Sequence, residues 1–222
     1  MHFQFLIEDY SGEVFIRHVM DKLIYQYNNI TYDCKAFRGL GGFKISGDVN
    51  KVKTDKLLND LSIYLRGFDK NLQGIAAAII IVLDNDKRDT NKFRNALEAQ
   101  AQLAMISTDY VFCIAVEEVE AWLLGDREAL QSAYPDIRLS LLKDYIQDSI
   151  CEPGTWEMLA NSVYKGGLKR FKKDCPTYRE VGKYKAEWAN KVGEYIDIDR
   201  NISPSFQAFI EELRKRLKIA WN

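Results

Sequence analysis

The chain has 222 residues with a net charge of −1, and hydrophobic residues make up 47% of it. This length suits one large α/β domain, or a core domain with a helical extension, and the small net charge excludes a global field that would draw the protein to nucleic acid. No apolar run reaches the length of a membrane span and the N-terminus has no signal-peptide pattern, so a cytoplasmic protein is expected. The four cysteines form no C-x-x-C pair, which argues against structural zinc and favours free thiols.

The first half of the chain alternates short apolar runs with amphipathic stretches. The apolar runs predict strands at residues 3–7, 30–37, 76–83 and 110–116. Helical spacing predicts helices at residues 11–27, with Ser11 as the N-cap, at 48–66, at 89–105 and from Glu117 onward. This alternation predicts an α/β fold with a mostly parallel sheet that helices flank on both faces.

The periodicity changes after about residue 125, and no further strand is predicted. Helices are expected near 126–133, 137–148, 155–173 and 177–194. Pro204 suits the first turn of a last helix. We therefore expect an α/β core at residues 1–125 and a helical C-terminal part at residues 126–222 that packs on it.

Carboxylates follow three of the predicted strands. They are Glu8 and Asp9, then Asp84 and Asp86, then Glu117, Glu118 and Glu120. In open α/β sheets, sites form beyond the carboxyl ends of the strands, and acids gathered there repel one another unless a cation neutralises them. Oxygen-only ligands suit Mg²⁺ or Mn²⁺. Glu117 and Glu120, three residues apart at a helix start, could share one face and complete a second metal position.

Each of these acids, taken singly, also fits an ordinary structural role. Asp84-Asn85-Asp86 could form a turn after a strand, and the glutamates could favour the positive end of a helix. Asp89 is better explained as the N-cap of the next helix. The coincidence of several acids at one sheet edge is what favours a metal site.

A basic stretch lies between Lys165 and Lys191, where nine lysines and arginines face three acids and aromatic residues are interleaved. Such a stretch fits a surface that follows a nucleic-acid backbone. The alternative is a solvated helix face whose aromatic side chains turn inward. The glycine-rich loop at residues 38–43 has no phosphate-binding motif and is interpreted as a mobile loop that could border the site.

The motifs together resemble the Toprim domain, which topoisomerases, bacterial primases and nucleases of the overcoming-lysogenisation-defect class share. The details look closer to a Toprim-like family of bacterial proteins of unassigned function. The matching segments are Ile7–Glu13, Val82–Asp89, Glu120–Asp126 and Ser203–Phe206. One departure is Asp9, which stands where Toprim domains usually carry glycine, and it argues against direct transfer of the topoisomerase mechanism.

The resemblance implies a Toprim- or Rossmann-like sheet and a role for each site residue. Glu8 would be a general base or metal ligand, Asp84 and Asp86 would hold Mg²⁺ or Mn²⁺, and Lys185 would contact a phosphate or the transition state. Trp122 is expected to be a core residue rather than a stacking platform.

These roles imply a Mg²⁺-dependent nuclease that cleaves phosphodiester bonds of DNA or RNA. The resemblance also implies a bacterial setting of phage defence or toxin-like action, a possible ATPase partner and a possible oligomer. Two alternatives stay open. The protein could be a non-catalytic module that binds a metal or a partner and acts with an ATPase, or it could transfer nucleotides as primases do.

Overall fold

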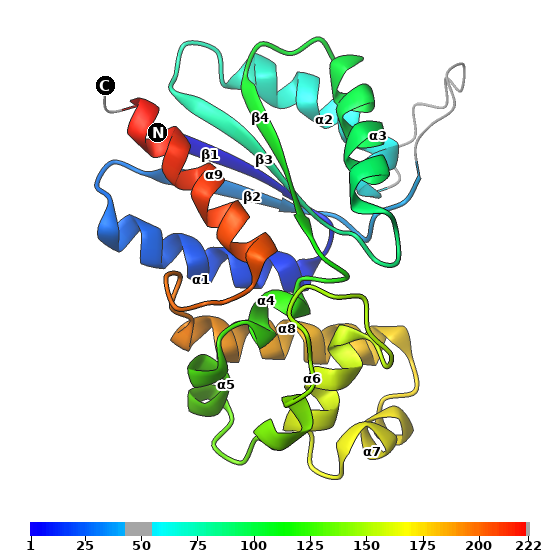
Figure 1. Cartoon of the computed structure of the whole chain (residues 1–222). Coiled ribbons are helices and arrows are strands. Elements are labelled where there is room, and N and C mark those ends of the chain that lie inside the picture. Colours follow the sequence, from blue (N-terminus) through cyan, green and yellow to red (C-terminus); the bar gives the residue numbers. More distant parts are fainter. Residues whose placement is uncertain (43–54, 221–222) are drawn as a thin grey trace.

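The protein is described by a computed structural model that covers residues 1–42 and 55–220. Its sheet is parallel throughout, with the strand order β2-β1-β3-β4 (Figure 1). The strands are β1 (His2–Ile7), β2 (Thr31–Ala36), β3 (Ala77–Asp84) and β4 (Asp109–Ala115). The expected α/β fold is confirmed, and each strand lies within one residue of its predicted bounds.

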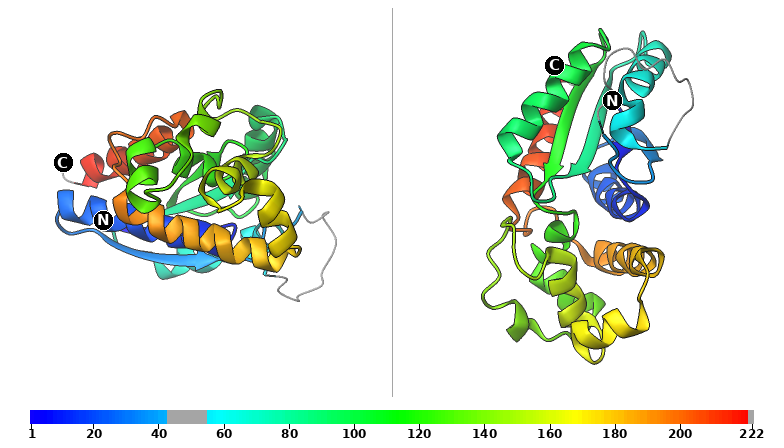
Figure 2. Two further views of the ribbon diagram at one scale, coloured as in Figure 1. Left: turned by 90° about the horizontal axis from the view of Figure 1, so that it is seen from below. Right: turned by 90° about the vertical axis from the view of Figure 1, so that its right-hand side faces the viewer.

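Within the described residues, three helices connect the strands, and the others follow β4. The connecting helices are α1 (Tyr10–Gln26), α2 (Leu57–Asn71) and α3 (Thr90–Gln102). After β4 come α4 (Glu120–Leu124), α5 (Arg127–Ala133), the 3-10 helix η1 (Leu139–Leu142), α6 (Thr155–Val163), α7 (Gly167–Asp174), α8 (Tyr178–Tyr195) and α9 (Pro204–Ala220). Helices α4 to α8 form a lobe beyond the carboxyl ends of the strands, whereas α9 returns to lie along one face of the sheet (Figures 1 and 2).

The sheet buries a different hydrophobic cluster on each face. On β3, Ala78, Ile80 and Val82 belong to the cluster shared with α1, α9 and the lobe, and the residues between them belong to the cluster shared with α2 and α3. This division follows from the period of two in a strand. Because β3 is covered on both sides, its apolar run is continuous.

Helix α9 lies within the predicted C-terminal part, yet it packs on the sheet. The ring of Phe209 stacks on Trp122 with centroids 5.1 Å apart and meets the edge of Phe5 at 6.5 Å. Trp122 is fully buried, so its expected role in the core is confirmed. Residues 126–222 therefore divide between the lobe and the α9 layer of the sheet.

Helices α1 and α8 lie side by side and run in the same direction (Figure 2). His18 Nε2 lies 3.1 Å from Asn190 Oδ1, and Lys22 Nζ donates to the Glu194 carbonyl at 2.8 Å. A Cβ on Gly193 would lie only 2.7 Å from the His18 ring, so a glycine is needed for this close approach. This contact fixes α8 against α1.

Several predicted helices differ from the observed ones. The helix expected at 48–66 begins at Leu57, and residues 43–54 lie outside the described residues. The single helix expected at 155–173 is wrong, because Gly166 and Gly167 have φ values of 92° and 72° and separate α6 from α7. Of the helix expected at 137–148, only η1 forms. The residues after η1 are not helical and run toward α4, where Gln147 donates to the Ala121 carbonyl at 2.6 Å.

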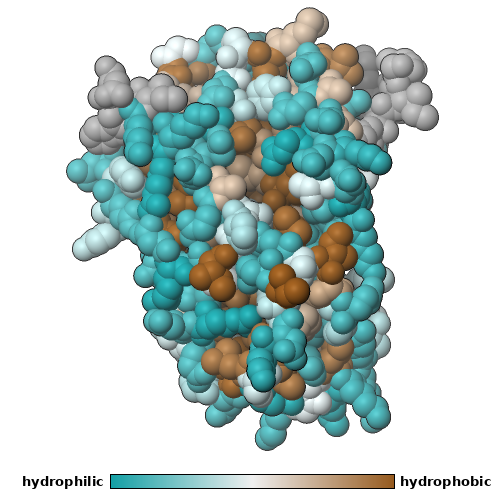
Figure 3. All heavy atoms as spheres, in the orientation of Figure 1, coloured by the Kyte–Doolittle hydropathy of each residue, from teal (hydrophilic) through white to brown (hydrophobic). Residues whose placement is uncertain are grey.

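None of the helices in the described part of the chain is long and apolar enough to cross a membrane. The face drawn in Figure 3 is mostly hydrophilic, with apolar side chains gathered in a hollow over β4. That hollow is a pocket of about 590 Å³ lined by Val111, Cys113 and Phe209, among others. It lies beside β4, the outer strand of the sheet, and contains none of the predicted site residues.

Candidate active site

The two central strands bring Glu8 and Asp84 together. Ile7, the last residue of β1, stands opposite Val82 in the parallel register, so the residues that follow leave the sheet at the same edge. The Glu8 backbone N–H donates to the Val82 carbonyl at 3.0 Å, and the Glu8 carboxylate accepts from the Asp84 backbone N–H at 3.0 Å. The predicted proximity of these two acids is therefore present in the structure.

Asp84 points to the face of the sheet that carries α1 and the lobe. Its Oδ1 accepts from the Val119 backbone N–H at 3.0 Å, just before α4. Burial, followed by the charge of Glu8, raises the pKa of Asp84 well above its usual value. Within the described residues, one oxygen of Glu8 and one of Asp84 accept no hydrogen bond.

Lys185 reaches into this group of acids from α8. Its ammonium lies 2.6 Å from Glu118 and 3.1 Å from Glu120, whose side chain is only 2% exposed. Burial acts to lower the pKa of Lys185, but attraction to Glu120, Glu118, Asp84 and Asp9 raises it well above its usual value. We call Glu8, Asp9, Asp84, Glu118, Glu120 and Lys185 the acidic cluster.

The cluster holds more carboxylates than positive charges, and the pKa values reflect this. Burial raises the pKa of Glu8 to about 7, with further contributions from the charges of Asp86 and Asp9. Burial likewise raises the pKa of Glu120 to about 8, although Lys185 opposes this shift. A site of this kind attracts further positive charge.

Asp9 also determines where α1 begins. Its carboxylate accepts from the Gly12 backbone N–H at 2.8 Å and from the Ser11 hydroxyl at 2.7 Å. The N-cap of α1 is therefore Asp9, and the prediction of Ser11 was wrong by two residues. A Cβ on Gly12 would meet the Ile7 side chain at 2.8 Å, so a glycine lets the helix start close to the strand.

Asp86 lies at the rim of the cluster. Its side chain is about half exposed and forms an ion pair with Arg88. Its backbone has a φ of 50° and donates to the Glu117 carbonyl at 2.8 Å. Asp89 accepts from the Lys92 backbone N–H at 2.8 Å and caps α3, as expected.

Glu117 is separated from Glu120, contrary to the prediction that the two share a helix face. Helix α4 starts only at Glu120, and Glu117 has a φ of 63°, which turns its side chain toward the lobe. There its buried carboxylate accepts from the Thr155 backbone N–H at 3.2 Å, from the Thr155 hydroxyl and from the Cys151 thiol at 3.4 Å. Glu118, which was not assigned a role, takes the place beside Lys185.

The donor set suits a hard divalent cation. Within residues 1–42 and 55–220, no group of three or more His, Cys, Asp or Glu side chains is placed so that it could hold a metal ion. Mg²⁺, however, is usually held by one or two carboxylates with water and substrate phosphates completing its shell. Glu8 and Asp84 are the candidates for these carboxylates, since each has an oxygen that accepts no hydrogen bond from a described residue, and Asp86 stands nearby.

The glycine-rich loop begins beside this site. The Gly39 backbone N–H donates to the Glu8 carbonyl at 2.9 Å, and Gly39 has a φ of 95°, which glycine adopts readily. At Gly39 this loop therefore contacts the backbone of Glu8. Phe43, the last residue of the predicted loop, lies outside the described residues.

The two motifs Glu120–Asp126 and Ser203–Phe206 contact each other in the structure. Trp122 Nε1 donates to Ser205 Oγ at 2.8 Å, and Asp126 forms a bidentate ion pair with Arg200, with both distances 2.9 Å. A Cβ on Gly125 would lie 2.1 Å from Asn201 Oδ1, so no larger side chain fits there. Apart from Glu120, these motifs therefore stabilise the position of α4 and do not line the acidic cluster.

The aromatic side chains in and beside the basic stretch from Lys165 to Lys191 divide into buried and exposed ones. Phe171 and Trp188 are buried, and Tyr164 and Tyr184 pack on them with ring centroids 5.1 to 6.2 Å apart. For these four rings the inward-facing alternative is correct. Tyr178, at the start of α8, is the exception, with 95% of its surface exposed.

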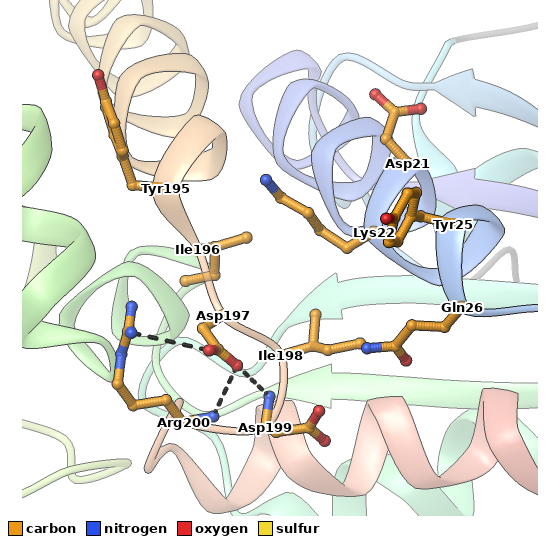
Figure 4. Close-up of a pocket in the computed structure, with 10 residues that line it drawn as sticks. All are labelled: Asp21, Lys22, Tyr25, Gln26, Tyr195, Ile196, Asp197, Ile198, Asp199 and Arg200. Atoms are coloured by element: carbon orange, nitrogen blue, oxygen red, sulfur yellow. Dashed lines mark hydrogen bonds and ion pairs between the residues drawn. The ribbon is translucent and has the colours of Figure 1, made fainter.

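A further groove lies away from the acidic cluster. Figure 4 shows this groove, about 640 Å³ in volume, between the last turns of α1 and the connection from α8 to α9. Tyr25, Lys22, Asp197 and Arg200 are among its lining residues, and none of them is a predicted site residue. Asp197 accepts from the backbone of Asp199 and Arg200, so it serves to order the connection.

The fold and the site define a parallel α/β protein with an acidic cluster at the carboxyl edge of its sheet. Residues 7–214 match the family described as a domain of unknown function (DUF4276), and the chain belongs to this family. No curated protein and no solved structure matches the chain.

Proposed function

We propose that this protein is a Mg²⁺-dependent nuclease whose site is formed by Glu8 and Asp84, with Asp86 at its rim. The observation that carries the proposal is the hydrogen bond from the Asp84 backbone to the Glu8 carboxylate, at 3.0 Å. It holds acids from two neighbouring parallel strands at the edge where α/β enzymes place their sites. Two such carboxylates form the usual protein share of a Mg²⁺ site.

The Toprim resemblance supports the same assignment. The acid after the first strand and the Asp-x-Asp after the third are the residues that carry that resemblance, and β1 and β3 are neighbours in the sheet. A Toprim-like relationship, a cytoplasmic location and a role in bacterial defence are all part of this proposal.

Each residue of the cluster has a definite task in the proposed reaction. Glu8 and Asp84 would hold the ion, which when bound polarises a phosphate and neutralises developing negative charge. The Val119 backbone orients Asp84, and the Asp84 backbone orients Glu8. Lys185 offsets the charge of Glu118 and Glu120, which lets a negatively charged substrate approach.

A second function is favoured by Lys185 itself. Because its ammonium already bonds two of the acids, the cluster is partly neutralised without any metal. Such a site suits a non-catalytic module that binds a metal or a basic partner and acts with an ATPase. The two functions differ in that the nuclease cleaves its substrate and the binding module does not.

A cleavage assay separates the two functions. Labelled DNA and RNA, single-stranded and duplex, are incubated with the protein in Mg²⁺ or Mn²⁺, beside Glu8→Gln, Asp84→Asn and the surface control Glu187→Gln, which removes one exposed carboxylate of α8. We expect both site variants to lose more than the roughly 10- to 100-fold typical of residues around a metal site, and the control to keep full activity. Equal cleavage by all four proteins would refute the site.

The same experiment addresses the second function. If no nucleic acid is cleaved while calorimetry shows Mn²⁺ binding that Asp84→Asn abolishes, the binding module is the better description. Incorporation of labelled nucleotides into a primer would instead indicate nucleotidyl transfer at the same site.

A further inference from the structure

The first two turns of α8 leave an exposed face that points the same way as Lys185. Residues seven apart in a helix lie within about 20° of each other, so Tyr178 and Lys185 share one face and stand about 10 Å apart along the axis. Lys185 enters the acidic cluster, and Tyr178 is 95% exposed with no ring contact or hydrogen bond to any described residue. The ring of Tyr178 is therefore exposed to solvent on the same face of α8 as Lys185, which enters the acidic cluster.

Gly182 lies between these two residues on the same face. A Cβ built on it would meet nothing within 4 Å, so packing inside the protein does not require a glycine there. Glycine weakens a helix interior relative to alanine. A glycine that the fold does not need, next to a candidate site, is suited to the close approach of a ligand to the backbone.

The surroundings of this face are basic. Arg179 and Lys183 lie on the same turns, about 100° and 140° around the helix from Tyr178, and so border this face. Like Lys169 and Lys173 of α7, they form no ion pair with a described residue, whereas Arg170, Lys172 and Lys191 do. Helix α1 runs beside α8 only from Asp9, which interacts with Lys185, to Lys22, which bonds the Glu194 carbonyl. The first turns of α8 therefore project beyond α1.

We infer that Tyr178 and Gly182 on this face, together with Arg179 and Lys183 on the adjoining side of the same turns, bind single-stranded nucleic acid and guide it to the acidic cluster. An exposed ring beside cations is the combination by which proteins hold an unpaired strand, with a base on the ring and phosphates on the cations. In a duplex the base faces are already stacked, so the ring of Tyr178 has nothing to bind. The inference rests on the proposed nuclease function and specifies its substrate class.

Fluorescence anisotropy in EDTA tests the inference without any cleavage. The probes are a short labelled single-stranded DNA, the RNA of the same sequence and the corresponding duplexes. We expect the intact protein to bind both single strands more tightly than either duplex. Tyr178→Ala should weaken single-strand binding by about 5- to 150-fold, the range that loss of one stacked base implies.

The chain offers a matched control in Tyr25, which is 93% exposed on α1 in the groove of Figure 4. Tyr25→Ala should bind as the parent protein does. Gly182→Ala should raise the Tm, since alanine favours the helix, and at the same time weaken single-strand binding. Arg179→Ala and Lys183→Ala should each reduce the salt slope by about 0.7, the value for one phosphate contact on a single strand.

Tighter binding of duplex, no binding of any probe, or equal effects of Tyr178→Ala and Tyr25→Ala would each overturn the inference. Failure of the nuclease proposal has a different signature. In that case the protein binds single strands through Tyr178 but does not cleave them when Mg²⁺ or Mn²⁺ is added.

Discussion

The ammonium of Lys185 lies 3.1 Å from a carboxylate oxygen of Glu120, and both side chains are largely shielded from solvent. Lys185 stands on α8 and Glu120 opens α4, so this ion pair joins two helices of the lobe. Removing one partner of a shielded pair leaves the other charge without compensation, and this loss usually exceeds what the pair contributes.

Replacing Lys185 with methionine should therefore destabilise the protein strongly. We expect Lys185→Met to lower the free energy of unfolding by about 3–5 kcal/mol above pH 8, where Glu120 is ionised, because Glu118 and Glu120 lose their counter-charge. Urea denaturation measures this change. Lys183→Met removes an exposed lysine of the same helix and should stay within about 0.5 kcal/mol of the parent protein.

The double variant completes the test of this pair. Adding Glu120→Gln to Lys185→Met should restore much of the lost stability, since the buried charge that Lys185 had offset is then absent. If Lys185→Met were no more harmful than Lys183→Met, the ion pair would not be what stabilises the cluster.

The raised pKa of Glu8 predicts a stability that depends on pH. Burial raises this pKa from about 4.5 to about 7, so the folded protein holds the proton more tightly than the unfolded chain does. The contribution of Glu8 to stability therefore falls as the pH rises through this window and is lowest above it. Asp86 and Asp9 add to this effect, and Lys185 opposes it.

Glu8→Gln should remove this penalty. At pH 8 the variant should be more stable than the parent by about 1–3 kcal/mol, the scale that such a shift implies. At pH 4 the two proteins should be equally stable, because Glu8 is then protonated in both states. Thermal unfolding across this pH range measures the difference, and a constant difference between pH 4 and pH 8 would contradict the assignment.

The ion pair of Asp126 with Arg200 supports the site from a distance. Asp126 has a fully buried carboxylate, which also accepts from the backbones of Ala129 and Asp197. We expect Asp126→Asn to destabilise the protein by about 3 kcal/mol, since it leaves Arg200 without its main partner. Asp136→Asn, at an exposed position, is the matched control, and similar denaturation midpoints for the two variants would refute this role.

The pairing of Glu8 with Asp84 could be predicted because it depends on local rules. An apolar run that ends in an acid predicts a buried strand with a carboxylate at its end, and parallel strands share that edge. The strand order was not predicted, since it depends on which strands pack together and not on the pattern within any one of them.

The contacts of the lobe depend on parts of the chain that are far apart in sequence. Glu117, Glu118 and Glu120 look alike in the sequence, but a positive φ at Glu117 sends its side chain to Thr155, and the other two meet Lys185. The sequence does contain one signal that Lys185 points inward. Lys185 falls in the helical spacing of Trp188 and Val192, which are buried, and this indicates a lysine on the inner face of α8.

Anomalous diffraction from crystals of the intact protein soaked in Mn²⁺ shows directly whether Glu8 and Asp84 bind a metal ion. We expect a peak at the carboxyl edge of the sheet, within about 2.0–2.6 Å of oxygens of Glu8 and Asp84. The same soak of Asp84→Asn crystals should give no peak at this position. A saturating soak that leaves Glu8 and Asp84 without a metal, or places Mn²⁺ only at other carboxylates, would show that these two residues do not form a metal site.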